Sequence, residues 1–131
     1  MKYKTILFLT LSLLIAGLLA GCQVDTVEVG MVETHLPGNW RASYRTFSGT
    51  KRDTFRAEAG QTLRLAYDVV VERGNLTIEV QDPDGKILWD ASLQENKADV
   101  ADVSLQKDGR YTLVVRGNDT GGRWNLTWDV R

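Results

Sequence analysis

The sequence predicts an all-β protein, a single antiparallel β-sandwich of jelly-roll type preceded by a helical signal peptide. Apolar and polar residues alternate along several stretches, which is typical of half-buried strands because successive side chains point to opposite faces. Turn-forming residues separate these stretches at a spacing of about ten residues, as in antiparallel sandwiches. Beyond residue 22 no long amphipathic pattern predicts a helix.

The composition fits one globular domain. The chain has 131 residues, of which 43% are hydrophobic and 25% are charged, and its net charge is −1. This length matches a single domain, and the composition excludes wholesale disorder. A near-neutral chain without a Lys/Arg cluster argues against nucleic acid as a partner. A single Cys and a single His exclude a disulfide framework and a multi-Cys zinc site, and we expect no cofactor.

The alternation is longest between Thr62 and Val71, where five apolar residues share one phase. It returns at 76–80, 111–115 and 124–130, and we expect a strand at each. Because Trp124 and Trp128 share their phase with Leu126, both indoles are predicted to lie in the core.

Turn residues lie between these strands. Asp82-Pro83-Asp84-Gly85 has the residues that a type I turn prefers. Further turns are predicted at Gly74-Asn75, at Lys107-Asp108-Gly109 and at Gly117-Asn118-Asp119, which Gly121-Gly122 extends. The longest polar connection, Asp90 to Asp99, is expected to be a mobile loop.

The N-terminus has the pattern of a processing signal. Lys2 and Lys4 precede an apolar run from Ile6 to Ala20, which is too short for a comfortable spanning helix and matches a secretory signal. We therefore expect a signal peptide at 1–21, a polar tether at 22–39 that adds one edge strand, and a β-sandwich at 40–131.

Cys22 directly follows Leu19-Ala20-Gly21, and this segment resembles a bacterial lipobox. The resemblance implies a diacylglycerol on the Cys22 sulfur and cleavage before this residue. Two acyl chains hold a protein stably on a bilayer. The chain is then expected on the outer face of the cell membrane, or in the outer membrane of a host that has two. The alternatives are an ordinary signal peptide with a coincidental Cys and a retained membrane anchor.

The body of the chain resembles the bacterial pre-peptidase C-terminal domain, a small β-sandwich of secreted proteins. The resemblance rests on Asp53-Thr54-Phe55, Ala59 to Leu63, Leu76 to Gly85 and Gly109 to Leu113. It implies a non-catalytic accessory module, some of which bind polymers or calcium.

The residues themselves do not indicate an enzyme. The only His, His35, lies in the predicted tether, so no nucleophile and base are paired. The carboxylates at Asp82, Asp84, Asp108 and Asp119 belong to turns, where Asp bonds to its own backbone. Asp82-Pro83-Asp84-Gly85 also resembles the start of a calcium loop, although an EF-hand needs Gly and Glu where Ile87 and Leu93 stand. Calcium stays the less favoured alternative to a turn.

Two functions follow as hypotheses. The first is a lipid-anchored binding or envelope-accessory module, whose partner is an envelope protein, a wall polymer or a small ligand. The alternative is a carbohydrate-binding module that uses exposed aromatic side chains such as Trp40 and Trp89. Coplanar exposed rings would favour the alternative, and buried indoles would count against it.

Overall fold

The structure is a computed structural model, and it describes residues 26–131. The predicted signal peptide, the lipobox and Cys22 lie outside the described residues. Within 26–131 no helix is long and apolar enough to cross a membrane.

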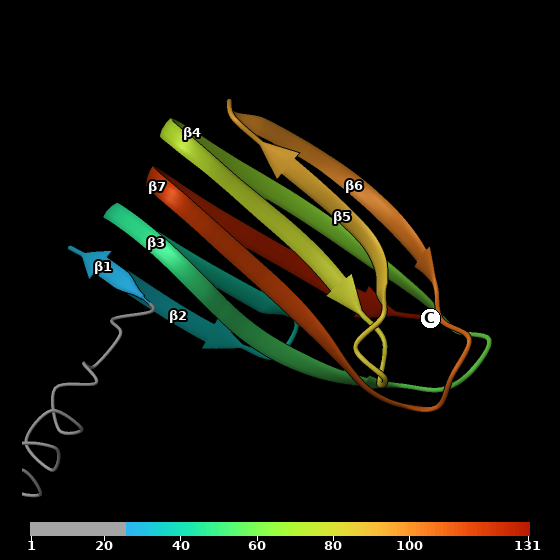
Figure 1. The fold of residues 1–131 in the computed structure, drawn as a ribbon. Helices are drawn as coiled ribbons and strands as arrows, with labels where there is room; N and C mark the ends of the chain where they lie inside the picture. Colours follow the sequence, from blue (N-terminus) through green and yellow to red (C-terminus); the bar gives the residue numbers. More distant parts are fainter. Residues whose placement is uncertain (1–25) are drawn as a thin grey trace, which may run out of the picture.

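Seven strands form one antiparallel sheet, and the all-β prediction is confirmed. Three of them are long and lie side by side in the order β3, β7, β4 (Figure 1). The strands are β1 (Val27–Val29), β2 (Val32–Leu36), β3 (Asn39–Ala57), β4 (Thr62–Gln81), β5 (Ile87–Leu93), β6 (Lys97–Ser104) and β7 (Gly109–Val130).

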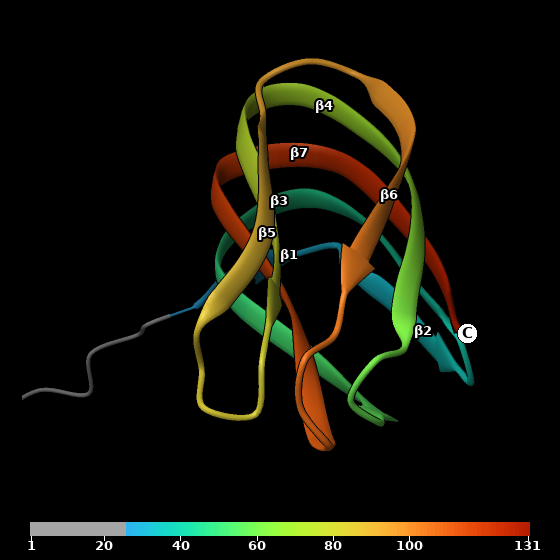
Figure 2. The same cartoon turned by 90° about the vertical axis from the view of Figure 1, so that its right-hand side faces the viewer.

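The long strands arch over, so that the single sheet folds into two layers (Figure 2). The layer that we call the β6 layer contains β2, the first part of β3, the last part of β7, the first part of β4 and β6. The opposite layer, the β5 layer, contains residues 49–57 of β3, 109–117 of β7, 75–81 of β4 and β5. The core lies between the two layers.

Two predicted turns are bends within continuous strands. The chain does not reverse at Gly74-Asn75 or at Gly117-Asn118-Asp119, because β4 and β7 run through these positions with shifts of register. Gly122 shows why glycine is needed at the bend: its φ is +139°, and a Cβ there would collide with the carbonyl oxygen of Val70. The sequence signal for a break was correct, but it marks the fold line of the sheet.

The hairpin between β4 and β5 is as predicted. Gly85 N–H donates to the Asp82 carbonyl at 3.0 Å, and the Asp82 side chain accepts from the backbone of Asp84 and Lys86 at 2.9 Å each. The prediction of a mobile loop from Asp90 to Asp99 is wrong, because β5 and β6 occupy most of that range and only residues 94–96 connect them.

Two short strands lie in the stretch that the sequence assigns to a tether with one edge strand. Both pair with β3, β1 along residues 46–48 and β2 along residues 39–43. His35 is therefore part of the sheet.

The centre of the core is aromatic. Trp124 is 1% exposed, and its ring lies 5.3 to 5.7 Å from the rings of Trp40, Tyr44 and Phe47. The core prediction is thus confirmed for Trp124, while Trp128 packs against the core and is partly buried.

Candidate functional site

The outer face of the β6 layer carries a row of side chains that crosses all its strands. On β3 the residues Trp40, Ala42 and Tyr44 are buried, whereas Arg41 and Ser43 between them are exposed. The pairing register then places one residue from each strand in line: Thr34 of β2, Arg41 of β3, Asn125 of β7, Asp68 of β4 and Ala98 of β6.

Two hollows open on this face, and Asn125 belongs to both. The first, of about 260 Å³, lies over β2, β3 and β7; we call it the basic hollow. Its lining residues are Val32, Thr34, Arg41, Ala42, Ser43, Arg123, Trp124 and Asn125. The second, of about 380 Å³, lies over β4, β6 and β7; we call it the acidic hollow. Its lining residues are Ala66, Tyr67, Asp68, Ala98, Asp99, Val100, Asn125 and Thr127.

Asn125 is held in place by its neighbour on β3. Asn39 Nδ2 donates to Asn125 Oδ1 at 2.8 Å and also lies 3.1 Å from Thr127 Oγ1. This fixes the orientation of the Asn125 amide. Within residues 26–131 its own Nδ2 has no hydrogen-bond acceptor, so a donor faces the two hollows.

The charged groups of the face are weakly engaged. Arg123 Nη1 lies 3.4 Å from Asp68 Oδ2, and both side chains are about half exposed, so this ion pair contributes little. Arg41 is exposed and has no ion-pair partner in the described part of the chain. Both guanidinium groups are therefore available to a ligand.

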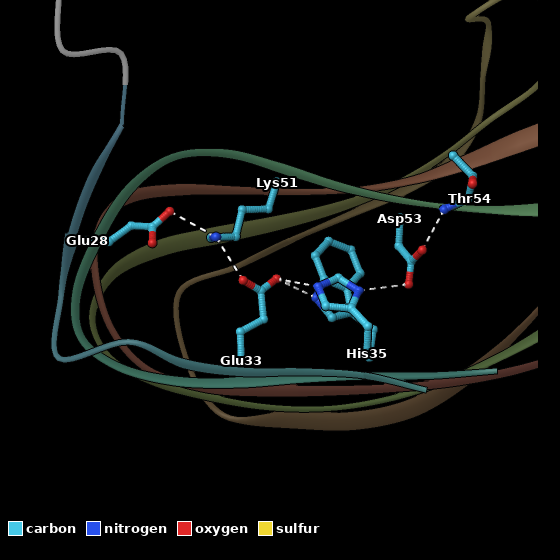
Figure 3. A network of polar contacts seen from close by, with 7 residues as sticks. Glu28, Glu33, His35, Lys51, Asp53 and Thr54 are labelled. Carbon is cyan, nitrogen blue, oxygen red and sulfur yellow. Dashed lines mark hydrogen bonds and ion pairs between the residues drawn. The ribbon is translucent and has the colours of Figure 1, made fainter. Parts of the chain in front are cut away.

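A separate polar network closes one edge of the sandwich (Figure 3). It joins Glu33 and His35 of β2 to Lys51 and Asp53 in the second part of β3. His35 Nε2 lies 2.8 Å from Glu33 Oε1, and His35 Nδ1 lies 3.1 Å from Asp53 Oδ2. Lys51 Nζ lies 2.8 Å from Glu33 Oε2 and 2.9 Å from Glu28 Oε1. The contacts connect the two layers.

The network shifts the protonation of its members. Burial alone would lower the pKa of His35, but the hydrogen bonds with Asp53 and Glu33 outweigh it and raise the pKa. Burial would likewise raise the pKa of Glu33, but the hydrogen bonds from Lys51, Trp40 and His35 lower it. Because Lys51 pairs with Glu28 and Glu33, and His35 bridges Glu33 and Asp53, the network is a structural clamp between the two layers.

The aromatic residues proposed for ligand binding do not form an exposed platform. Trp40 is fully buried, and its indole N–H donates to Glu33 Oε1 at 2.7 Å, so the expectation of an exposed Trp40 is wrong. Trp89 is partly buried and its ring lies 5.5 Å from that of Tyr67. In residues 26–131 the exposed large apolar side chains are all aliphatic.

The carboxylates of the predicted turn have a cation of their own. Lys107 Nζ lies 2.9 Å from Asp82 Oδ2 and also contacts the Asp84 carboxylate, and it lowers the pKa of Asp82. In the described chain no group of three or more His, Cys, Asp or Glu side chains could hold a metal ion. The geometry here is that of a turn closed by a lysine.

Sequence reasoning missed one buried charge. Glu79 points outward from the β5 layer but is only 7% exposed, because Arg116 covers it with Nε 3.0 Å from Glu79 Oε1. The hydrogen bond from Arg116 lowers the pKa of Glu79. Only the cross-strand pairing of β4 with β7 could have shown this pair.

Comparison with known proteins identifies the fold but no family. No protein-family pattern and no curated protein matches the chain. A structure of TmCBM61 in complex with β-1,4-galactotriose has a TM-score of 0.53 at 14% identity, covering 86% of each chain. A CBM4 structure has a TM-score of 0.49 at 7% identity, covering 78% of this chain and 77% of that one.

A carbohydrate-binding module from Cellvibrio mixtus lichenase 5A, in complex with cellotriose, has a TM-score of 0.45 at 15% identity. The match covers 85% of this chain and 88% of that one. The likeness to TmCBM61, at 14% identity, shows the β-sandwich fold alone. The resemblance to the pre-peptidase C-terminal domain has no support from a protein-family pattern.

Proposed function

We propose that this protein is a lipid-anchored extracytoplasmic module that binds a glycan on the outer face of the β6 layer. The observation that carries the proposal is the pair of adjoining hollows that share Asn125. The likeness to TmCBM61 establishes a fold, and a fold alone does not determine function. The chemistry of the face supplies the argument.

A sugar presents hydroxyl groups at its edges and C–H groups on its faces, and the two hollows offer partners for both. Arg41 and Asn125 supply donors, and Asp68 supplies an acceptor. Ala66, Ala98 and Val100 supply apolar surface beside them. Recognition would then depend on hydrogen bonds and aliphatic contacts and not on an exposed aromatic platform.

The volumes suit a ligand that occupies both hollows. Ligand sites commonly measure about 300 to 1,000 Å³. The acidic hollow, of about 380 Å³, lies within this range and the basic hollow, of about 260 Å³, lies just below it, and the two adjoin along one row. Arg41 and Asp68 stand two strands apart, which corresponds to about 10 Å. A short oligosaccharide laid across the strands would reach both hollows.

Anchoring through Cys22 is the second part of the proposal. Three residues stand between Cys22 and Thr26, so four steps along the chain span at most about 14 Å even when extended. β1 lies at the opposite end of the sheet from the C-terminus (Figure 1). A lipid on Cys22 would hold the β1 end at the bilayer and leave the outer face of the β6 layer open to envelope polymers.

The test is affinity electrophoresis of the full chain, solubilised in detergent, through gels that contain individual envelope and plant polysaccharides. We expect at least one polymer to retard the protein, and Asn125→Ala to abolish the retardation. Ser92→Ala, an exposed change on the β5 layer, is the matched control and should migrate as wild type. Equal retardation of both variants would place the ligand elsewhere, and no retardation by any polymer would refute glycan binding.

The anchor has its own test. Membranes from cells that make the full chain should retain the wild type, and a mass spectrum should show a diacylglyceryl group on Cys22. Cys22→Ala should remain uncleaved and unlipidated. An unmodified Cys22 in the mature wild-type protein would contradict the anchoring proposal.

A further inference from the structure

We infer that the basic hollow binds a carboxylate of the glycan, so that the ligand is an acidic polysaccharide with uronate units. This inference rests on the proposed function and specifies its substrate class. It is drawn from the distribution of charge over the two hollows, which differs sharply although they adjoin.

The basic hollow is lined by donors without a carboxylate among them. Arg41 and Arg123 flank it, and Thr34, Ser43 and Asn125 add two hydroxyls and an amide. Arg41 is exposed and unpaired within residues 26–131, so binding an anion would not require it to leave a protein partner. A guanidinium offers a planar pair of N–H donors that matches both oxygens of a carboxylate.

The acidic hollow has the opposite character. Asp68 presents its carboxylate to it, and none of its lining residues is Lys or Arg. Asp99 also lines it, but Asp99 pairs with the buried Tyr67, so its side chain lies on the inner side of the sheet. A carboxylate bound there would meet the like charge of Asp68, whereas a neutral sugar hydroxyl can donate to it. Ala66, Ala98 and Val100 provide apolar contacts for the ring. The neutral sugar unit therefore belongs in the acidic hollow and the uronate in the basic one.

Asp68 connects the two hollows. Its carboxylate lies 3.4 Å from Arg123 Nη1, which orients the Arg123 side chain along the face. The distance is long for a charge-assisted hydrogen bond, which is usually about 2.7 to 2.9 Å, so Arg123 keeps donors for a ligand. Arg41 is the primary carboxylate contact and Arg123 is the second.

The experiment compares polymers that differ only in charge. The detergent-solubilised full chain is run through gels of polygalacturonate and of its fully methyl-esterified form, with alginate and hyaluronan as further uronate polymers and neutral glucans and galactans as controls. We expect at least one uronate polymer to retard the wild type, and the methyl ester to bind at least tenfold more weakly than polygalacturonate if that polymer is the one bound. Higher salt should weaken the retardation because the Arg–carboxylate contact is exposed to screening.

Variants assign the effect to the hollow. Arg41→Gln should lower the affinity for the uronate polymer at least tenfold and leave the melting temperature within about 2 °C of wild type, since Arg41 is exposed and unpaired in the described chain. Arg52→Gln, an exposed arginine on the β5 layer, removes the same charge elsewhere and should bind as wild type.

The failures of the two proposals are distinguishable. Retardation by neutral polymers alone, or equal loss of binding in Arg41→Gln and Arg52→Gln, overturns the carboxylate assignment and leaves glycan binding standing. Retardation by no polymer at all overturns both.

Discussion

Removal of the Trp124 indole tests whether the fold line of the sheet is held by the aromatic cluster. The indole is 1% exposed and contacts three aromatic rings, from Trp40, Tyr44 and Phe47, at centroid distances of 5.3 to 5.7 Å. Replacing a buried Trp by Ala usually costs about 3 to 5 kcal/mol, because the lost transfer free energy is joined by the cost of a cavity. We expect Trp124→Ala to lie in the upper half of this range, since the indole is almost fully buried among these three rings.

The consequence can be measured by urea unfolding followed by circular dichroism. A domain of this size has about 5 to 15 kcal/mol of stability, so the variant should unfold at a much lower urea concentration. Trp124→Phe keeps most of the aromatic contact and should lose considerably less. Trp89→Ala, at a partly buried site, is the matched control. A loss below about 1 kcal/mol in Trp124→Ala would refute the central role of this indole.

Two further perturbations address the clamp and the bend. Because the pKa of His35 is raised above 6.5, the His35 contacts with Glu33 and Asp53 stabilise the fold below that pH and are lost as the pH rises through the folded-state value. His35→Gln should therefore lower the free energy of unfolding by about 0.2 to 1 kcal/mol more at pH 6 than at pH 9. The difference is small because the imidazole is exposed. An equal loss at both pH values in urea titrations would contradict the clamp. Gly122→Ala should lower stability by about 1 to 3 kcal/mol or more, since its Cβ would collide with the Val70 carbonyl. Gly60 also has a positive φ, of +93°, but no atom lies within 4 Å of the Cβ that Gly60→Ala would add. In parallel thermal melts Gly122→Ala should therefore melt at a clearly lower temperature than Gly60→Ala.

The sequence predicts those parts of the fold in which burial alone decides the pattern. The strand segments at 62–71, 76–80, 111–115 and 124–130 are confirmed, because their inward positions are occupied by apolar residues. β3 was not among the predicted strands. In its second part Lys51 and Asp53 occupy inward positions at an edge of the sandwich, where they pair with Glu33 and His35. Polar residues at such positions conceal the period of a strand.

The glycines at the bend were misleading for a different reason. A glycine between two alternating segments indicates a break, but it does not tell whether the chain reverses or bends. In β4 and β7 the partner strands bend at the same place, so Gly74 and Gly117 lie within continuous strands. The distinction depends on pairing between strands, which local sequence does not contain.

The candidate site could not be predicted from local pattern either. Arg41, Asn125 and Asp68 lie in three strands and become neighbours only through the register of β3, β7 and β4. The sequence holds one signal for the site: Asn125 stands between Trp124 and Leu126, which share the inward phase, so its side chain faces outward. The search for exposed aromatic residues led instead to Trp40, which is buried in the core.

Hydroxyl-radical footprinting of the full chain, with and without the polysaccharide that retards it, tests the location of the binding face most directly. Val32 at 68% exposure and Val100 at 44% lie on the β6 layer beside the two hollows, while Ile87 at 49% lies on β5 and serves as an internal reference. We expect the ligand to reduce oxidation of Val32 and Val100 relative to Ile87. Protection of Ile87 with unchanged oxidation of Val32 and Val100 would contradict the account.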